Sequence, residues 1–305
     1  MTSPESNGDV TRSWVPIAGR WSVDAQAVRY LGTQPDPGVP YGICLTSDNS
    51  TDGTIQVRIR FDGPEGGRIL LGYRSPTERY LMVGLGGWQR AYTIGEFDPG
   101  SGWRGLAVGG TAENLSSTRS YDIEVTITGQ RISLSVDKVR VLEHVLEKPL
   151  TGGQVGLFAW GNQAVEFSSF VFDRRPATVF VVMQFSEPYN RLYEDVIKPV
   201  TTDLGLMAYH AGDVFRPGLI LHDVVQGIIE AKVIVAEITP PNQNVFYELG
   251  YAHALAKPTI LLAERGKQLP FDVSGYRVLF YDNTIAGKNQ VEDGLKKHLT
   301  AILRE

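Results

Sequence analysis

The chain has 305 residues, of which 42% are hydrophobic and 21% charged, and its formal net charge is −5. A chain of this length can hold two domains with separate cores, and its composition is that of a globular protein. The negative balance and the lack of any Lys/Arg run argue against a nucleic-acid partner, which would need a basic face. No apolar stretch reaches the ~18 residues that a membrane-spanning helix requires.

The first residues, MTSPESNGDVTR, combine no basic start with no hydrophobic segment. We therefore expect a flexible tail over residues 1–12 and no secretory signal. Cys44 is the only cysteine, which excludes an internal disulfide and a cysteine-based zinc cluster. These features together favour a reducing, cytoplasmic location.

Strand patterns fill residues 13–175. Apolar and polar residues alternate over 55–61, over 123–127 and again over 132–136, which gives each strand one buried and one solvated face. The turn TGQR between the last two predicts a hairpin, with Gly129 available for a positive φ. Regular strands without a convincing helix predict an all-β antiparallel sandwich.

The sandwich resembles the concanavalin A-like or laminin-G-like jelly rolls, notably in its ending GGQVGLFAWGNQAVEFSSFVF. The resemblance implies a module whose ligand is a glycan, a protein or a small molecule, because such folds host many functions. All five Trp residues lie in this half of the chain. Exposed indoles could stack on sugars, whereas Trp buried in a β core is the commoner case. No pair of acids on facing strands suggests glycosidase chemistry, so we expect none here.

A charged linker, DRRPAT at 173–178, separates the sandwich from residues 176–305, and after it the hydrophobic pattern changes its period. Continuous apolar strands such as VFVVMQF, KVIVAEI and PTILLAE alternate with helical stripes. Strand and helix alternate five times, which predicts a doubly wound α/β domain with a parallel five-stranded sheet.

Ligands of such sheets bind beyond the carboxyl ends of the strands. The helix in NVFYELGYAHALAKP starts directly after the strand KVIVAEI, so Glu248 should lie near the rim of that cleft. A carboxylate among aromatic and apolar neighbours is costly to bury unless it is paired or has a function.

The stretches VFVVMQFSEPYNRLYEDVI, AKVIVAEITPPNQNVFYELGYAHALAKPTILLAE and LPFD resemble the nucleoside 2-deoxyribosyltransferase superfamily and the prokaryotic TIR-like domains. The resemblance covers residues 177 to about 282. It implies that Glu248 is the catalytic carboxylate that attacks or stabilises the anomeric carbon of a ribosyl–base bond. Asp223 and Asn244 match polar positions of these enzymes, the aromatic residues could stack on a base, and Asp223 or Glu237 could orient the ribose or protonate the departing base. The predicted substrate-binding residues are Phe185, Ser186, Asp213, Asp223, Glu237, Asn244, Tyr247 and Tyr251.

Each of these residues also has a structural interpretation. Glu248 could simply favour the helix dipole, and Asn244 could cap the helix. Asp223 could be a solvated residue in an early helical turn, and Glu237 could pair with a nearby Lys or Arg. The histidines at 210, 222 and 253 lack metal-ligand spacing, so no metal is expected.

Three functions follow from these patterns. The first is cleavage of an N-ribosyl bond, with NAD⁺ as substrate rather than cofactor, in a defence-type effector. The second is base exchange by a nucleoside deoxyribosyltransferase. The third is a non-catalytic nucleotide- or glycan-binding module. Because related enzymes often complete their sites from neighbouring subunits, we also expect a homo-oligomer.

Overall fold

The computed structural model describes residues 12–32, 40–63, 65–150, 152–213, 219–270, 273 and 275–304. The predicted flexible tail lies outside these residues, apart from Arg12. No helix in the described ranges is both long and apolar enough to cross a membrane. Within the same ranges, no group of three or more His, Cys, Asp or Glu side chains could hold a metal ion.

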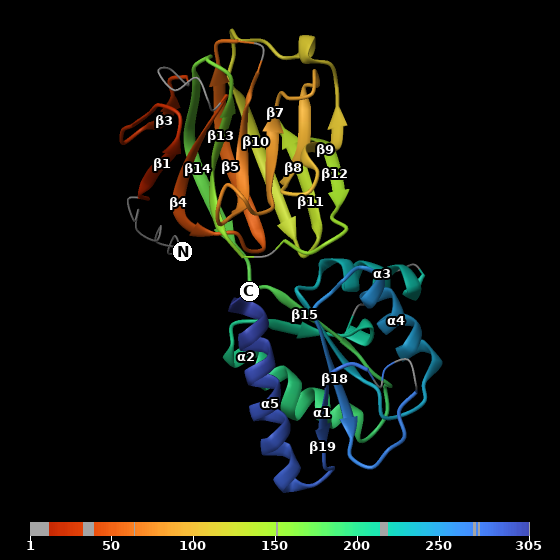
Figure 1. Ribbon diagram of the computed structural model, residues 1–305. Coiled ribbons are helices and arrows are strands. Elements are labelled where there is room, and N and C mark those ends of the chain that lie inside the picture. Colours follow the sequence, from red (N-terminus) through yellow and green to blue (C-terminus); the bar gives the residue numbers. More distant parts are fainter. Residues whose placement is uncertain are drawn as a thin grey trace, which may run out of the picture.

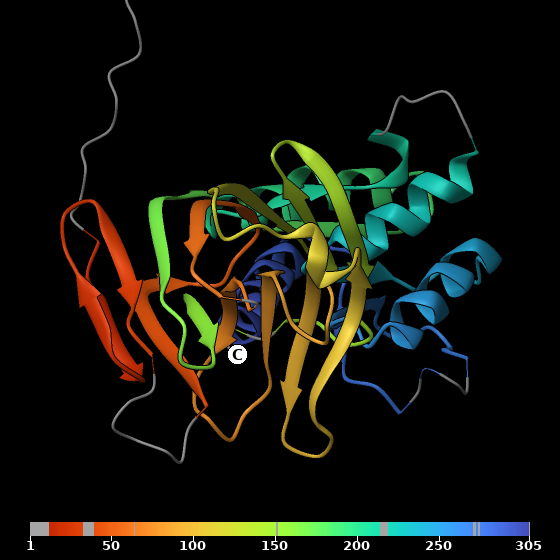
Figure 2. The same cartoon turned by 90° about the horizontal axis from the view of Figure 1, so that it is seen from above.

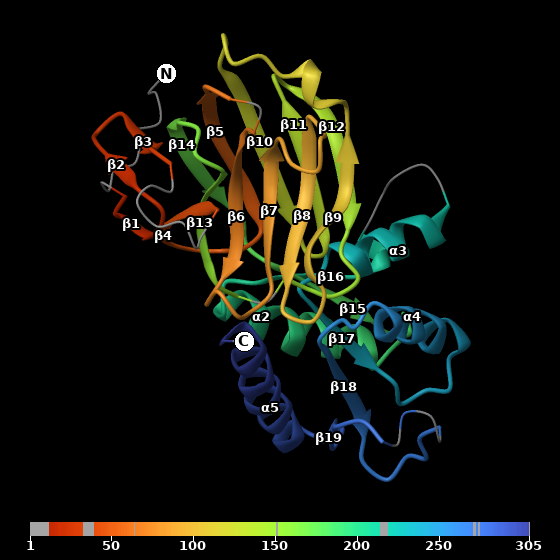
Figure 3. The same cartoon turned by 45° about the horizontal axis from the view of Figure 1, so that its top comes forward.

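Two antiparallel seven-stranded sheets form a jelly-roll sandwich and lie face to face (Figure 2, Figure 3). Sheet A has the order β1-β4-β13-β6-β7-β8-β9, and sheet B the order β12-β11-β10-β5-β14-β3-β2. The strands of sheet A are β1 (Trp14–Ala18), β4 (Tyr41–Asn49), β6 (Gly67–Tyr73), β7 (Tyr80–Leu85), β8 (Tyr92–Asp98), β9 (Gly102–Gly109) and β13 (Gln154–Trp160). Those of sheet B are β2 (Trp21–Val23), β3 (Ala27–Tyr30), β5 (Gly53–Phe61), β10 (Tyr121–Thr128), β11 (Arg131–Val136), β12 (Val139–Val145) and β14 (Val165–Arg174). A short 3₁₀ turn, Ala112–Asn114, follows β9.

The alternation seen in the sequence determines which face of each strand is buried. In β5, Ile55, Val57 and Ile59 are buried in the core between the sheets, and the polar residues between them face outward. The β10–β11 hairpin is in the predicted register, and Gly129 in its turn has φ +57°. The predicted sandwich is therefore confirmed.

The rest of the described chain forms a parallel five-stranded sheet in the order β16-β15-β17-β18-β19 (Figure 1). Its strands are β15 (Thr178–Val182), β16 (Met207–Tyr209), β17 (Val233–Glu237), β18 (Thr259–Glu264) and β19 (Val278–Tyr281). The helical segments are α1 (Tyr189–Leu192), a π-helical turn (Tyr193–Ile197), α2 (Lys198–Asp203), a 3₁₀ turn (Ala211–Asp213), α3 (Ile220–Glu230), α4 (Gln243–Ala254) and α5 (Ile285–Arg304). We call this part the α/β unit.

Helices cover both faces of the parallel sheet, as the continuous apolar strands predict. α2 and α5 pack on one face, around Val181 and Val235, and α3 and α4 pack on the other, around Phe180 and Ile234. The amino ends of β15 and β17 lie at the sandwich, so the carboxyl ends point away from it (Figure 1).

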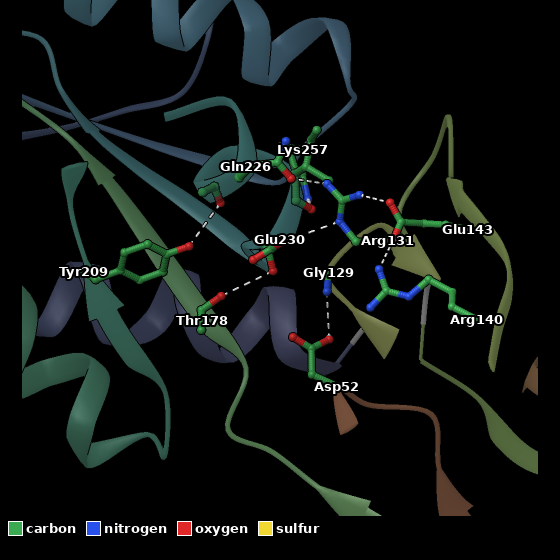
Figure 4. A network of polar contacts seen from close by, with 12 residues as sticks. Asp52, Gly129, Arg131, Arg140, Glu143, Thr178, Tyr209, Gln226, Glu230 and Lys257 are labelled. Carbon is green, nitrogen blue, oxygen red and sulfur yellow. Dashed lines mark hydrogen bonds and ion pairs between the residues drawn. The ribbon is translucent and has the colours of Figure 1, made fainter. Parts of the chain in front are cut away.

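The turn of the β10–β11 hairpin contacts the end of α3 and joins the sandwich to the α/β unit (Figure 4). The backbone N–H of Gln130 donates to the Ile229 carbonyl at 3.1 Å, and its Nε2 donates to the Leu255 carbonyl at 3.0 Å. Arg131 donates to the Gln226 side chain and lies 3.4 Å from a carboxylate oxygen of Glu230. Buried polar contacts on both sides of the junction fix the relative position of the two parts.

Glycine is required at the centre of this junction. A Cβ added at Gly129 would lie 2.4 Å from the carbonyl oxygen of Glu230, in a backbone conformation that already disfavours other residues. Beside it, the buried Lys257 donates from Nζ to the carbonyls of Ile229 and Ala231, at 2.6 and 2.7 Å. These bonds satisfy carbonyl groups at the C-terminus of α3 that have no partner within the helix.

Candidate functional site

Sheet A has an apolar cluster on the face that points away from sheet B. Successive residues of a strand point to opposite faces. Leu81 of β7 and Leu157 of β13 pack in the core between the sheets, whereas Met82 and Phe158 belong to a second cluster on the opposite face. An apolar surface on the outside of a sandwich is unusual for a sheet that only faces water, because such faces are normally polar.

This outer face contains a cavity of about 300 Å³. The residues that line it are Glu65, Arg68, Met82, Gly87, Trp88, Trp103, Phe158 and Trp160. The ring of Phe158 lies 5.4 Å from that of Trp103, and the Trp103 ring lies 5.8 Å from that of Trp160. Phe158 is fully buried, and the two indoles are partly exposed. Four aromatic side chains thus form the walls and floor of the cavity, which we call the aromatic cavity.

Trp88 is held at the edge of the cavity by an irregular turn. Gly86, Gly87, Trp88 and Gln89 have φ values of +77°, +98°, +50° and +58°. Two consecutive non-glycine residues in this region are strained, and strain of this kind clusters at functional sites. Hydrogen bonds from Thr93 Oγ1 and from Arg68 Nε to the Gly86 carbonyl, at 2.8 and 3.1 Å, hold the turn in place.

Two glycines make room for the indole of Trp88. A Cβ at Gly95 of β8 would lie 2.5 Å from Cη2 of the ring, and one at Gly105 of β9 would lie 3.7 Å from Cδ2. The six-membered ring therefore lies across both strands without side chains beneath it. Trp88 remains 40% exposed, so part of the indole is accessible from solvent.

The polar groups of the cavity are an ion pair. Nη2 of Arg68 lies 3.2 Å from a carboxylate oxygen of Glu65, with the Arg68 side chain 4% exposed and that of Glu65 33% exposed. The guanidinium also lies over the Phe158 ring, 5.7 Å from its centre. Burial of a charge is tolerated when it is paired and hydrogen-bonded, and both conditions are met here.

Burial was the commoner expectation for the tryptophans. Trp103 and Trp160 pack, partly buried, against the second apolar cluster, whereas Trp88 is 40% exposed. Trp14 and Trp21 do pack against the core, as predicted. The segment GLGG at 84–87 ends β7 with Gly84 and Leu85 and begins the turn with Gly86 and Gly87. The signal that could have indicated the cavity was the tryptophan directly after this glycine-rich turn.

No known family model and no curated protein sequence matches the chain. Solved structures resemble about half of it. The carbohydrate-binding module CBM66 of Bacillus subtilis shares 16% identity over 52% of this chain and 94% of its own, with a TM-score of 0.45. A galectin-like protein of unknown function from Bacillus subtilis shares 13% identity over 54% and 91%, with a TM-score of 0.40. A β-glucanase of Bacillus licheniformis shares 13% identity over 55% and 94%, with a TM-score of 0.39.

These comparisons contradict the predicted cleavage of an N-ribosyl bond in NAD⁺. The similar structures carry names from carbohydrate binding and glycan hydrolysis, and the resemblance to deoxyribosyltransferases and TIR-like domains receives no support. In the α/β unit, burial raises the pKa of Glu248 to about 7.

Glu248 has no polar partner among its apolar neighbours in the described part of the chain. It is partly buried in α4, and with the described residues it makes no hydrogen bond or ion pair. Glu248 does not belong to the residues that line the aromatic cavity. Burial without a partner is the only cause of its raised pKa.

Glu237 lies in the interior of the α/β unit, and its predicted part in substrate binding stays a prediction. The residue is fully buried, and its carboxylate accepts hydrogen bonds from the Thr239 N–H at 3.0 Å, from the Thr239 hydroxyl, and from the Tyr281 hydroxyl at 2.9 Å. Its hydrogen-bond partners are therefore Thr239 and Tyr281, and not the Lys or Arg that its structural interpretation suggested. It serves instead to link the carboxyl ends of β17 and β19.

Asn244 does not cap α4, because Asn242 is the N-cap. The Asn242 Oδ1 accepts from the backbone N–H of Asn244 at 2.9 Å. Asp213 accepts from the Tyr193 hydroxyl at 2.8 Å and from the His210 N–H at 3.1 Å, which gives it a structural role. A role for Asn244 in ligand binding stays a prediction.

The remaining predicted residues belong to the loop after β15, to α3 and to α4. The ring of Phe185 packs against that of His210 with 4.8 Å between centres, and Ser186 Oγ accepts from Gln184 Nε2 at 2.9 Å. Asp223 lies in the first turn of α3, and Tyr247 and Tyr251 lie on α4. Phe185 and Tyr247 are more than half exposed. Whether they contact a ligand stays a prediction.

Proposed function

We propose that the sandwich is a glycan-binding module whose ligand occupies the aromatic cavity. The observation that carries this proposal is the position of Trp88. A strained turn and two glycines hold its accessible indole beside a cavity with aromatic walls. Sugar rings present C–H groups on one face and hydroxyl groups at their edges. An aromatic surface with a few polar groups suits such a ligand, because it binds the apolar face while donors and acceptors bind the hydroxyls.

Binding without hydrolysis is the function that we propose. Glycoside hydrolysis canonically requires two carboxyl groups on opposite sides of the scissile bond. Glu65 is the one carboxylate among the residues that line the aromatic cavity, and it is engaged by Arg68. A second cavity, of about 280 Å³, contains more acids. Its most buried acid, Glu96, is bound by Arg79 and Arg104, which occupy both of its oxygens.

We also propose that the chain divides into a module of residues 13–175 and an α/β module of residues 176–305. β14 ends at Arg174 and β15 begins at Thr178, which supports a boundary in the segment between them. The predicted homo-oligomer stays a prediction.

The proposal is tested by titrating the full chain with a panel of oligosaccharides, followed by calorimetry and by tryptophan fluorescence. We expect saturable binding of at least one glycan, with a change in the emission of the indoles at the cavity. If no glycan binds and the fluorescence does not change, the proposal is wrong. Release of reducing sugar from a bound glycan would show hydrolysis and would contradict the restriction to binding.

A further inference from the structure

The charged groups of the aromatic cavity are balanced. Of the eight residues that line it, one is acidic and one is basic, Glu65 and Arg68, and they form an ion pair at 3.2 Å. The remaining lining residues are Met82, Gly87 and four aromatic residues. A ligand in the cavity therefore contacts apolar surface together with one negative and one positive group, whose charges cancel.

The guanidinium of Arg68 is fixed in position. Its Nε donates to the Gly86 carbonyl at 3.1 Å, and Nη2 faces Glu65. A Cβ on Gly87, whose φ is +98°, would lie 2.4 Å from Nη2, so the chain passes directly beside the guanidinium. A group that is held from several sides cannot swing to follow a ligand, and it presents the same donors to every ligand.

Hydroxyl groups match this pair better than charged groups do. A guanidinium offers five N–H donors, and the bonds within the described residues involve Nε and Nη2. A carboxylate offers only acceptors. Two adjacent hydroxyls can accept from Arg68 and donate to Glu65 at the same time, because each hydroxyl both donates and accepts.

A charged ligand would disturb the balance. The carboxylate of a uronic acid would approach Glu65 with like charge, while Arg68 is already neutralised by its partner. A protonated amino sugar could pair with Glu65 only by taking it from Arg68, whose side chain is 4% exposed, and this would leave a buried guanidinium unpaired. Like charges brought together in a partly buried site are strongly unfavourable, and this is how many sites reject the wrong partner.

We propose that the aromatic cavity selects an uncharged sugar ring with two adjacent hydroxyl groups, and that Glu65 is the residue that excludes acidic sugars. This inference rests on the proposed glycan-binding function and deepens it.

The test uses matched pairs of oligosaccharides that share ring stereochemistry: glucose with glucuronate units, and galactose with galacturonate units. We expect the full chain to bind a neutral member at least about tenfold more tightly than its acidic counterpart. Glu65→Gln should raise the affinity for the acidic member relative to that for the neutral member by roughly tenfold, because the amide keeps an acceptor oxygen and loses the negative charge. Glu113→Gln, at an exposed position outside the cavity, is the matched control and should change neither affinity.

Equal affinity of the unmodified chain for neutral and acidic members overturns the inference, as does an unchanged ratio in a folded Glu65→Gln protein. If Glu65→Gln does not fold, the salt dependence of the unmodified chain decides. Binding of an uncharged sugar should not change between roughly 50 mM and 500 mM salt, and a marked fall would contradict the inference. Failure of all four sugars and of the wider panel would instead refute the proposed function itself, and the inference with it.

Discussion

The six-membered ring of Trp88 lies so close to Gly95 that a single added carbon at Gly95 would come within 2.5 Å of Cη2. The backbone of Gly95 does not have the positive φ that would itself require glycine. The glycine is therefore needed for the space that it leaves to the indole.

Gly95→Ala should displace Trp88 and weaken glycan binding by roughly tenfold, about 1.4 kcal/mol, because the stacking surface moves away from its position. The indole can rotate toward solvent, so the fold should persist. Calorimetry and thermal unfolding on the same protein measure both effects. Gly250→Ala, in a helix with nothing within 4 Å of the added carbon, is the control and should bind normally. Normal affinity in the Gly95→Ala protein would show that the position of the Trp88 indole over Gly95 does not contribute to glycan binding.

The junction between the sandwich and the α/β unit gives a second prediction. Gly129→Ala adds a carbon 2.4 Å from the Glu230 carbonyl oxygen, in addition to the strain of its positive φ. Gly205→Ala has a similar φ, +70°, but nothing within 4 Å, so it isolates the strain. We expect a loss of about 1 kcal/mol for Gly205→Ala and of about 3 kcal/mol or more for Gly129→Ala. Denaturant unfolding measures both free energies of unfolding. Equal losses of stability would mean that the junction accommodates the added carbon at Gly129 without destabilisation.

Glu248 gives a prediction about pH. Its pKa rises from 4.5 to about 7 on folding, so between these values the folded state binds more protons than the unfolded state. Its contribution to stability is therefore fully present below pH 4.5 and is lost as the pH rises to about 7. Glu248→Gln should remove this loss and stabilise the protein at pH 8 by roughly 1–2 kcal/mol, after allowance for partial exposure.

Unfolding free energies at several pH values test this prediction, with Glu113→Gln as the exposed control. A Glu248→Gln protein that is less stable than the unmodified chain at pH 8 would show that the carboxylate has a partner that stabilises its charged form.

The sequence indicated those parts of the fold that depend on local pattern. The alternation around Ile55 and the turn at Gly129 are visible in short windows, and both were predicted correctly. Contacts between distant segments were not predictable in this way. β13 and β14 follow one another in the chain yet belong to different sheets, and Glu237 is satisfied by Tyr281, 44 residues further on.

The aromatic cavity was missed for the same reason. Its walls come from β9, β13 and the turn after β7, which only the order of strands in sheet A brings together. In a single strand, Trp103 and Trp160 look like ordinary core residues. The sequence resemblance of residues 177–282 points to Glu248, whereas the aromatic cavity lies on the sandwich.

The most direct test of the account compares Trp88→Ala with Tyr247→Ala by calorimetric titration of a glycan that the unmodified chain binds. Both side chains are aromatic and substantially exposed, at 40% and 57%, but Tyr247 lies on α4 of the α/β unit. We predict that Trp88→Ala weakens binding by tenfold or more, about 1.4 kcal/mol or more, with little change in Tm, and that Tyr247→Ala binds normally. A folded Trp88→Ala protein with unchanged affinity would contradict the account.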